Sequence, residues 1–204
     1  MGEIVLIRHG QTEWSANGRH TSVTDLPLTD RGEQQAKLLI GHLEPSDFGL
    51  VLSSPRRRAR DTARLAGFTG RHEPQLDEDL AEWAYGEYEG RTSAEIQEEV
   101  PGWTIWSHAA PGGETADQVS TRLDRVVERV RSSGVERAIC FPTATACGRS
   151  PCAGWASTSP SACTSRWTPA RSRCWARRRA CRHSSGGTPG PEPHLAGRPG
   201  GAQS

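Results

Sequence analysis

The feature that most constrains this chain is a continuous apolar run at residues 4–7, which ends at Arg8-His9-Gly10. Strands of a parallel sheet are covered on both faces, so they read as unbroken hydrophobic runs, whereas half-exposed strands alternate. Residues 50–52 and 138–141 repeat the pattern, and helical patterns separate the three runs. We therefore predict an α/β fold with a mostly parallel central sheet and helices on both faces, truncated after the strand near residues 137–141.

Local signals predict where the helices begin. Thr29 is a predicted N-cap, and Ser54 is another, with Pro55 at the first helical position. Two capping boxes, Thr92-x-x-Glu95 and Thr115-x-x-Gln118, predict two later helices. The polar segment at residues 11–27 is predicted to be a loop over the end of the first strand. The helix after Thr29 is expected to bury an apolar face made of Ala36, Leu39, Ile40 and Leu43.

The composition changes sharply after Phe141. Residues 1–141 hold 16 Arg and Lys against 23 Asp and Glu, a net charge of −7, whereas residues 142–204 hold 9 Arg against one acidic residue, a net charge of +8. The second segment has no Val, Ile, Phe or Tyr. Such a segment cannot bury enough apolar surface to offset the entropy lost on ordering. We therefore predict an incomplete domain at residues 1–141 and a disordered low-complexity tail at residues 142–204.

Three segments carry groups suited to an anionic substrate. Arg8-His9-Gly10 lies at the predicted carboxyl end of a strand, where open α/β sheets bind ligands. Residues 54–62 follow the second strand and begin an arginine-rich helix, whose free N–H groups add positive potential. Residues 82–90 place carboxylates among aromatic side chains, surroundings that favour the protonated form of a general acid. Taken singly, these segments also fit a polar turn, a solvated basic helix face and an acidic surface turn.

In this order and spacing, the motifs resemble those of the histidine phosphatase superfamily, the phosphoglycerate-mutase-like proteins. The resemblance covers residues 3–141. Residues 8–15, 18–21 and 24–29 are similar to the family's first phosphate loop, and residues 54–62 to its second arginine motif. Residues 82–90, Trp103-x-x-Trp106 and Gly112-Gly113-Glu114-Thr115 are similar to its acid segment, most of all in the acid-phosphatase and sedoheptulose-bisphosphatase branches.

The resemblance implies a phosphomonoester hydrolase that acts on small phosphorylated metabolites, such as sugar phosphates, in two steps. His9 would attack phosphorus and carry the phosphoryl group. Arg8 and Arg58 would bind the phosphoryl oxygens, where fixed cations stabilise the transition state. Glu82 would protonate the departing oxygen and then deprotonate the attacking water.

The resemblance also places Thr21 and Ser15 as hydrogen-bonding groups for the phosphate. Ser15 stands where the family usually has asparagine, which favours the phosphatase branches over a phosphoglycerate-mutase-type phosphotransferase. No cofactor and no metal are implied. We expect a cytoplasmic protein without a membrane span, because no apolar run approaches the roughly 20 residues that a span needs and no leader opens the chain.

The chain departs from the family after residue 141. The family has a second catalytic histidine in a His-Gly motif there, whereas this chain reads Pro142-Thr143-Ala144 with no histidine. Translated one base earlier with G+C-rich codons, residues 142–155 can encode His-Gly-His-Gly-Leu-Arg-Ala-Leu-Ala-Val-Arg-Trp. We therefore hypothesise a frameshift near Phe141, in the gene or in its sequencing. Losing one such group costs on the order of 10²–10³ in rate, so we predict weak or absent activity.

Three alternatives remain open. The arginine-rich tail with Trp155, Trp167 and Trp175 could bind nucleic acid by charge and stacking, although an out-of-frame G+C-rich gene yields the same composition and we expect no nucleic-acid partner. Cysteines and a histidine of the tail could bind zinc, although their spacings form no paired knuckles. The candidate zinc ligands are Cys147, Cys152, Cys174, Cys181 and His183. As a third alternative, the domain could be a noncatalytic phosphate-binding remnant.

Overall fold

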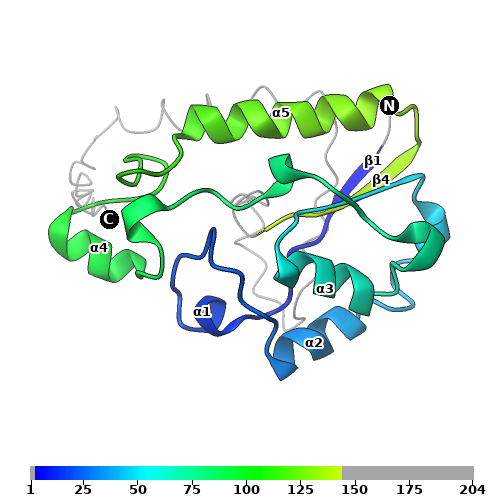
Figure 1. Cartoon of the computed structure of the whole chain (residues 1–204), viewed down its shortest axis with the longest axis horizontal. Helices are drawn as coiled ribbons and strands as arrows, with labels where there is room; N and C mark the ends of the chain where they lie inside the picture. Colours follow the sequence, from blue (N-terminus) through cyan, green and yellow to red (C-terminus); the bar gives the residue numbers. More distant parts are fainter. Residues whose placement is uncertain (1–2, 144–204) are drawn as a thin grey trace, which may run out of the picture. The chain divides into compact units, whose positions relative to one another are not determined.

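The computed structural model of this chain describes residues 3–143 (Figure 1). Its four strands form one sheet in the order β1-β4-β2-β3, and every pair of neighbouring strands is parallel. The strands are β1 (Glu3–Leu6), β2 (Leu50–Ser53), β3 (Gln75–Leu76) and β4 (Arg137–Phe141). The three apolar runs therefore form strands as predicted. Of the tail predicted to be disordered at residues 142–204, Pro142 and Thr143 are described and are buried. The rest of that tail lies outside the described residues, as do the alternative zinc ligands and nucleic-acid-binding segment.

Five α-helices connect or follow the strands in the described part of the chain. They are α1 (Glu13–Ala16), α2 (Asp30–Lys37), α3 (Arg57–Leu65), α4 (Ser93–Glu99) and α5 (Ala116–Ser132). Thr29 caps α2 by accepting a hydrogen bond from the Gly32 N–H, as predicted. Both capping boxes are confirmed, at the starts of α4 and α5. Short 3₁₀ turns occupy Pro45–Asp47, Gly70–His72, Glu78–Leu80 and Gly86–Tyr88.

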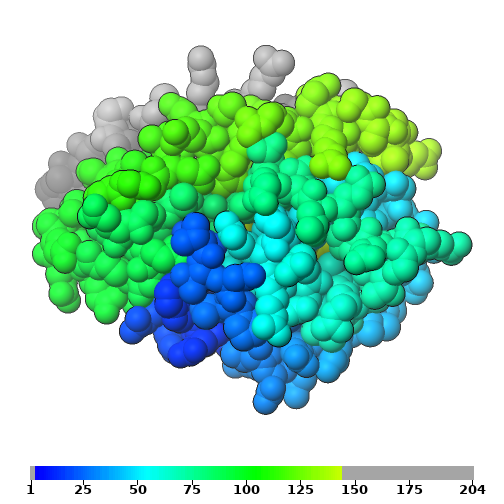
Figure 2. Space-filling model, in the orientation of Figure 1, coloured from blue at the N-terminus to red at the C-terminus, as the bar shows by residue number. Residues whose placement is uncertain are grey.

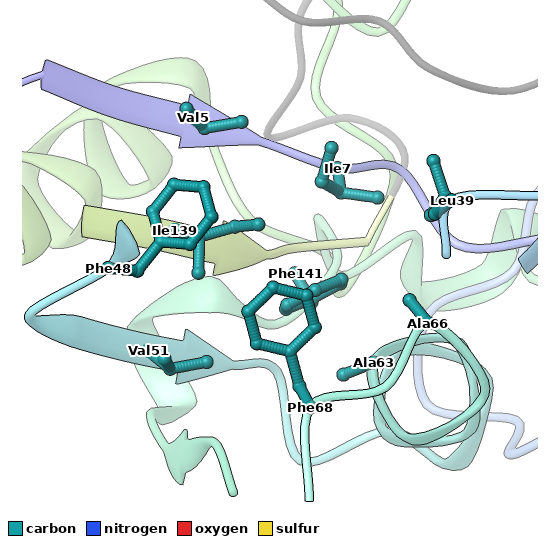
Figure 3. Close-up of a cluster of buried hydrophobic side chains, with 10 residues drawn as sticks. All are labelled: Val5, Ile7, Leu39, Phe48, Val51, Ala63, Ala66, Phe68, Ile139 and Phe141. Carbon is teal, nitrogen blue, oxygen red and sulfur yellow. The ribbon is translucent and has the colours of Figure 1, made fainter. Parts of the chain in front are cut away.

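Helices cover both faces of the sheet, as predicted. One buried cluster contains Val5, Val51 and Ile139 of the strands together with residues of α3 and the segment after α2 (Figure 3). The residues next in sequence point to the opposite face, where Leu52 and Cys140 pack with Val126 and Val130 of α5. Figure 1 shows α5 on one side of the strands and α2 and α3 on the other. Burial on both faces explains the unbroken apolar runs.

The structure corrects the predicted start of the second helix. Arg56, not Ser54, is the N-cap residue of α3, and its side chain makes no capping hydrogen bond. Pro55 precedes the helix, and the Ser54 hydroxyl accepts a hydrogen bond from the Arg56 N–H at 3.4 Å. The chain therefore turns for two more residues after β2 before it becomes helical. This turn sets the position of Arg58 within the first turn of α3.

Three further expectations differ from the structure. The segment at residues 11–27, predicted to be a loop, contains α1, which Thr12 and Ser15 close with a reciprocal capping box. The α2 helix ends at Lys37, so Ile40 lies beyond it and is exposed rather than part of a buried face. Strand β3 was not predicted because its two residues, Gln75 and Leu76, are exposed and carry no apolar run. Edge pairing with β2, rather than burial, makes it a strand.

Candidate functional site

The candidate site lies at the carboxyl ends of the parallel strands. His9 follows β1, Arg58 follows β2, and Glu82 follows β3 after a short turn. Strand β4 lies between β1 and β2 and ends at Phe141, followed by Pro142 and Thr143. Because all four strands are parallel, these ends share one edge of the sheet, where ligands of α/β proteins bind.

His9 is buried, and its ring holds a defined proton. Its Nδ1 lies 2.7 Å from the carbonyl oxygen of Gly10. A carbonyl oxygen only accepts, so Nδ1 carries the proton and Nε2 keeps its lone pair. Burial is the largest cause that lowers the pKa of His9 to about 3; the Gly10 hydrogen bond opposes this, while the charges of Arg58 and Arg8 add to it. The imidazole is therefore neutral at physiological pH.

The turn that holds His9 is packed directly against two helices. The Gly10 N–H donates to the Thr62 hydroxyl of α3 at 3.0 Å, and that hydroxyl donates to the Arg58 carbonyl at 2.7 Å. A Cβ atom on Gly10 would collide with the carbonyl group of Gly32 in α2. Only glycine allows so close an approach of two backbones. His9 is thus held by rigid elements on both sides.

Arg58 is fully buried, and among residues 3–143 its side chain binds only backbone carbonyls. Its guanidinium donates to the carbonyl oxygens of Thr24 (3.1 Å), Thr21 (3.2 Å) and Ser22 (3.3 Å). Its Nε–H is buried without a partner, and none of the ion pairs among residues 3–143 includes Arg58. Burial lowers its pKa, against the opposing effect of Glu82 and Asp25. The site therefore holds a buried cation without a directly bound anion.

The loop that supplies these carbonyls is fixed by Glu89. Its carboxylate accepts hydrogen bonds from the Ser22 N–H, the Thr24 N–H (3.0 Å) and the Ser22 hydroxyl. Partial burial acts to raise the pKa of Glu89, but these hydrogen bonds hold it below its ordinary value. Figure 2 shows the blue segment that contains this loop lying between the cyan and green segments of the surface. Glu89 is a positioning residue that the sequence analysis did not single out.

Glu82 is buried. One of its carboxylate oxygens accepts the N–H of Trp83 at 3.0 Å. Its charge acts on Arg58, and the charges of Arg58 and Arg8 act on His9. Arg8 itself is exposed. The structure thus brings together four residues that the sequence singled out, from three separate segments of the chain.

Thr21 and Ser15 are placed differently. Thr21 contributes its carbonyl to Arg58, while its hydroxyl contacts the Arg19 carbonyl at 3.4 Å. The Ser15 hydroxyl accepts from the Thr12 N–H at 2.8 Å and donates to the Thr12 carbonyl at 3.0 Å. Within the described residues, no hydrogen bond joins Ser15 to His9, Arg8, Arg58 or Glu82. Phosphate binding by either hydroxyl stays a prediction.

Arg56, the N-cap residue of α3, is a further arginine that was not among the site residues predicted from the sequence. The Nε of Arg56 is buried and has no partner, as in Arg58, and the charge of Arg56 acts on Arg58. Residue type and position offer no reason to prefer Arg56 over its neighbour Arg57, which donates its backbone N–H to the Asp25 carboxylate and pairs with the carboxylate of Asp61 at the surface. Burial of one nitrogen atom, which only the structure reveals, distinguishes them.

The described residues contain no cluster of three or more His, Cys, Asp or Glu side chains that could hold a metal ion. Residues 3–143 also contain no helix of the length and apolarity that crossing a bilayer requires. Directly after β4, Thr143 is buried and its hydroxyl donates to the Leu80 carbonyl at 3.4 Å. The arrangement is therefore a neutral imidazole within reach of the charges of Arg58 and Arg8, with the charge of Glu82 acting on Arg58. Groups of these kinds are suited to binding an anion and to nucleophilic attack on it.

The sequence of this chain is similar to a known protein family and to several known proteins. A sequence profile described as "Histidine phosphatase superfamily (branch 1)" matches residues 4–178. An acid phosphatase of Mycobacterium tuberculosis is 49% identical over 127 residues, which are 61% of this chain and 61% of that protein. A sedoheptulose 1,7-bisphosphatase of Saccharomyces cerevisiae is 38% identical, over 63% of this chain and 55% of that protein. The chain thus spans less than two-thirds of the length of these relatives.

Solved structures show the same fold. The structure of an open-reading-frame product of Mycobacterium tuberculosis matches with a TM-score of 0.64 and 39% identity, covering 70% of this chain and 74% of that one. A phosphoglycerate mutase of Thermus thermophilus matches with a TM-score of 0.54 and 34% identity, covering 71% and 79%. The fold, a parallel sheet with helices on both faces, is therefore of the phosphoglycerate-mutase-like type.

Proposed function

Since this chain belongs to the histidine phosphatase superfamily, we propose that it is a phosphomonoester hydrolase that works through a phosphohistidine intermediate. The single observation that carries the proposal is the neutral imidazole of His9, which is protonated on Nδ1 and not on Nε2, within reach of the charge of Arg58, a buried guanidinium whose Nε–H has no partner. A nucleophile must be unprotonated, and an oxyanion needs fixed donors that no other anion occupies. Among the described residues, the protonation of His9 and the partners of Arg58 meet both conditions.

In the first step, Nε2 of His9 attacks phosphorus, a P–N bond forms, and the P–O bond to the leaving group breaks. Arg8 and Arg58 bind the phosphoryl oxygens and stabilise the charge of the transition state. Glu82 gives its proton to the departing oxygen. In the second step, Glu82 takes a proton from water, the water oxygen attacks phosphorus, and the P–N bond breaks to release phosphate.

For the substrate, we propose small phosphorylated metabolites, sugar phosphates among them. The names of the relatives support this class, since one is a sedoheptulose 1,7-bisphosphatase and another an acid phosphatase. A mutase-type transfer is the alternative that the Thermus structure suggests. Incubation with 3-phosphoglycerate separates the two, because a hydrolase releases inorganic phosphate and a mutase produces 2-phosphoglycerate.

The experiment that tests the intermediate is transfer of ³²P from a labelled phosphate ester to the protein, quenched in base and then tested for loss of the label in acid, combined with turnover of the same ester. The base-stable, acid-labile label of phosphohistidine is expected on the unchanged chain and absent in His9→Ala. His42→Ala is the matched control, because His42 is exposed and belongs to none of the three segments that carry the candidate site. Equal turnover by the unchanged chain and His9→Ala would instead favour a noncatalytic phosphate-binding remnant.

We also propose that turnover by this chain is impaired, because Pro142 and Thr143 stand where the family carries its second histidine. A chain given the in-frame continuation His-Gly-His-Gly after residue 142 is expected to turn over on the order of 10²–10³ faster. The nucleotide sequence over codons 135–155 tests the frameshift itself. An uninterrupted frame without a slipped base would contradict it.

A further inference from the structure

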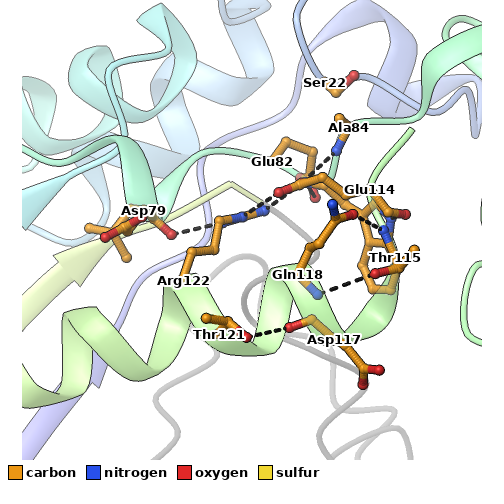
Figure 4. Close-up of polar contacts among 12 residues, drawn as sticks. Ser22, Asp79, Glu82, Ala84, Glu114, Thr115, Asp117, Gln118, Thr121 and Arg122 are labelled. Carbon is orange, nitrogen blue, oxygen red and sulfur yellow. Dashed lines mark hydrogen bonds and ion pairs between the residues drawn. The ribbon is translucent and has the colours of Figure 1, made fainter. Parts of the chain in front are cut away.

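We propose that Arg122 and Glu114 form a positioning pair for Glu82, holding the segment that carries this carboxyl group from both of its ends. The inference deepens the proposed function and rests on it, because it assigns the pair to the general-acid step. Neither residue touches the substrate in this proposal. Figure 4 shows Arg122 reaching from α5 between Asp79 and Glu114, with Glu82 above it.

A partly buried ion pair joins Arg122 to Glu114. The Arg122 side chain is buried, and its Nε and one terminal nitrogen donate to the two carboxylate oxygens of Glu114, at 2.9 and 3.1 Å. This bidentate geometry fixes both groups relative to each other. The other terminal nitrogen donates to the Asp79 carbonyl at 2.7 Å. One guanidinium therefore holds Glu114 and the backbone three residues before Glu82.

Glu114 in turn binds the two residues that follow Glu82, Trp83 and Ala84. Its carboxylate accepts the Ala84 N–H at 2.9 Å, its carbonyl accepts the Trp83 indole N–H at 2.8 Å, and its own N–H donates to the Ala84 carbonyl at 2.9 Å. The two residues directly after Glu82 are thus fixed by three hydrogen bonds to one residue. Glu82 lies between Asp79 and Ala84, both of which Arg122 holds directly or through Glu114.

The segment that carries Glu82 is also closely packed against its neighbours. A Cβ atom on Gly113 would collide with the Ala84 carbonyl, so the backbones of residues 84 and 113 approach as closely as only glycine allows. The Trp83 ring is buried and packs edge-on against Trp106, with 5.1 Å between ring centroids. A carboxyl group on a segment held in this way keeps its position, which proton transfer requires within a fraction of an ångström.

The neighbouring arginine of α5 provides a matched control. Arg125 lies on the same helix and pairs with the carboxylate of Asp79, but its side chain is exposed. It makes no hydrogen bond to residues 82–84 in the described part of the structure. Arg122→Lys and Arg125→Lys are therefore the same chemical change on the same helix. They differ in the groups that the original side chain binds: Glu114 and the Asp79 carbonyl for Arg122, and the Asp79 carboxylate for Arg125. Glu114→Gln is the change on the other side of the pair, and Glu82→Gln is the reference for loss of the acid.

The test compares two substrates that differ in how much they need a general acid. 4-Nitrophenyl phosphate has a leaving group that departs as the anion, whereas glycerol 2-phosphate releases an alkoxide that must be protonated. Glu114→Gln and Arg122→Lys are expected to lower kcat/KM on glycerol 2-phosphate about 10-fold or more and to leave kcat/KM on 4-nitrophenyl phosphate nearly unchanged. The comparison uses kcat/KM because it covers only the steps up to departure of the leaving group, whereas the later attack of water is common to both substrates. Arg125→Lys should match the unchanged chain on both. An equal loss on both substrates would show a merely structural role and overturn the proposal.

A second measurement needs no turnover. In NMR spectra of the full chain, Glu114→Gln is expected to shift the Ala84 amide, the Trp83 indole N–H and the carboxyl carbon of Glu82, while Arg125→Lys leaves all three in place. An unmoved Glu82 signal would overturn the pairing. If Glu82→Gln does not discriminate between the two substrates, the general-acid role fails. If Glu82→Gln discriminates and Glu114→Gln does not, only the positioning pair fails.

Discussion

Arg58 and Arg122 are both buried arginines, but their partners differ. Arg122 binds both oxygens of a carboxylate and one carbonyl, so a directly bound anion balances its charge. Arg58 binds three carbonyls and no carboxylate among the described residues, and its Nε–H is unpartnered. Burying a charge is costly unless it is paired. A buried arginine with a bound carboxylate stabilises its surroundings, whereas one held only by carbonyls keeps its charge available for an anionic ligand.

The largest expected effect comes from Arg58→Lys. Lysine keeps the charge but loses the planar fork that binds two oxygens. Turnover of a phosphate monoester should fall on the order of 10²–10³-fold, and affinity for orthovanadate should fall with it. Steady-state kinetics and calorimetric titration measure the two. Arg122→Lys should leave orthovanadate affinity unchanged, and an equal loss in both variants would remove the distinction between the two arginines.

The next effect is on stability. Arg122→Met leaves the Glu114 carboxylate without its partner, and the free energy of unfolding should fall by about 3 kcal/mol, as measured by urea denaturation. Arg125→Met removes an exposed pair and should cost less than about 1 kcal/mol. Glu114→Gln combined with Arg122→Met should recover part of the loss, because no lone charge remains. A double variant as unstable as the sum of the single variants would contradict the pairing.

The third effect depends on pH through His9. Its pKa is about 3 in the folded protein and about 6.5 when unfolded, so below pH 6.5 the unfolded state binds a proton that the folded state excludes. Stability is therefore lost as pH falls, by about 2–3 kcal/mol between pH 7 and pH 4.5 from this residue. His9→Asn should lose this part of the slope in urea denaturation at the two pH values, and His42→Asn should keep it.

The same titration distinguishes the two arginines. Burial is the first cause of the low pKa of His9, and the charge of Arg58 contributes after it. Arg58→Met should therefore raise the pKa of His9 but leave it below 6.5, whereas Arg122→Met should leave it unchanged. NMR titration of the His9 ring measures both. An unchanged pKa in Arg58→Met would show that the guanidinium charge does not reach the imidazole.

The smallest expected effect tests the link between Arg58 and the turn after β1. Thr62→Val removes the hydroxyl that accepts from the Gly10 N–H and donates to the Arg58 carbonyl. Leaving these buried groups unpaired should cost about 1–2 kcal/mol of unfolding free energy. Thr62→Ser keeps the hydroxyl and should cost less than Thr62→Val. A Thr62→Ser variant as unstable as Thr62→Val would indicate that the methyl group, not the hydrogen bonds, matters.

Much of the fold could be predicted from local sequence, and the exceptions have physical causes. Capping residues act within one turn, so Thr29 and Thr115 revealed their helices. The cap at Ser54 was wrong because the turn after β2 takes two more residues, a length that tertiary packing sets. The exposed edge strand at Gln75–Leu76 has no local signal, since its partner strand lies more than 20 residues earlier.

The candidate site also has some features that could be predicted from the sequence and others that only the structure shows. The residue types of His9, Arg58 and Glu82 and their places after strands could be predicted, because parallel strands bring their carboxyl ends to one edge. The proton on Nδ1 of His9 and the partners of Ser15 could not. They depend on distances between atoms that the sequence does not contain.

The sequence by itself determined which strands are buried on both faces, which turns begin helices, and which reactive side chains follow the strands. Only the tertiary structure decided which charges are neutralised. Arg58 and Arg122 look alike in a sequence, since both are arginines within helices. What separates them is the group that long-range packing places within hydrogen-bonding distance, a carboxylate for Arg122 and backbone carbonyls for Arg58. Electrostatic energy depends on that distance and on burial, and both are set when distant segments of the chain meet.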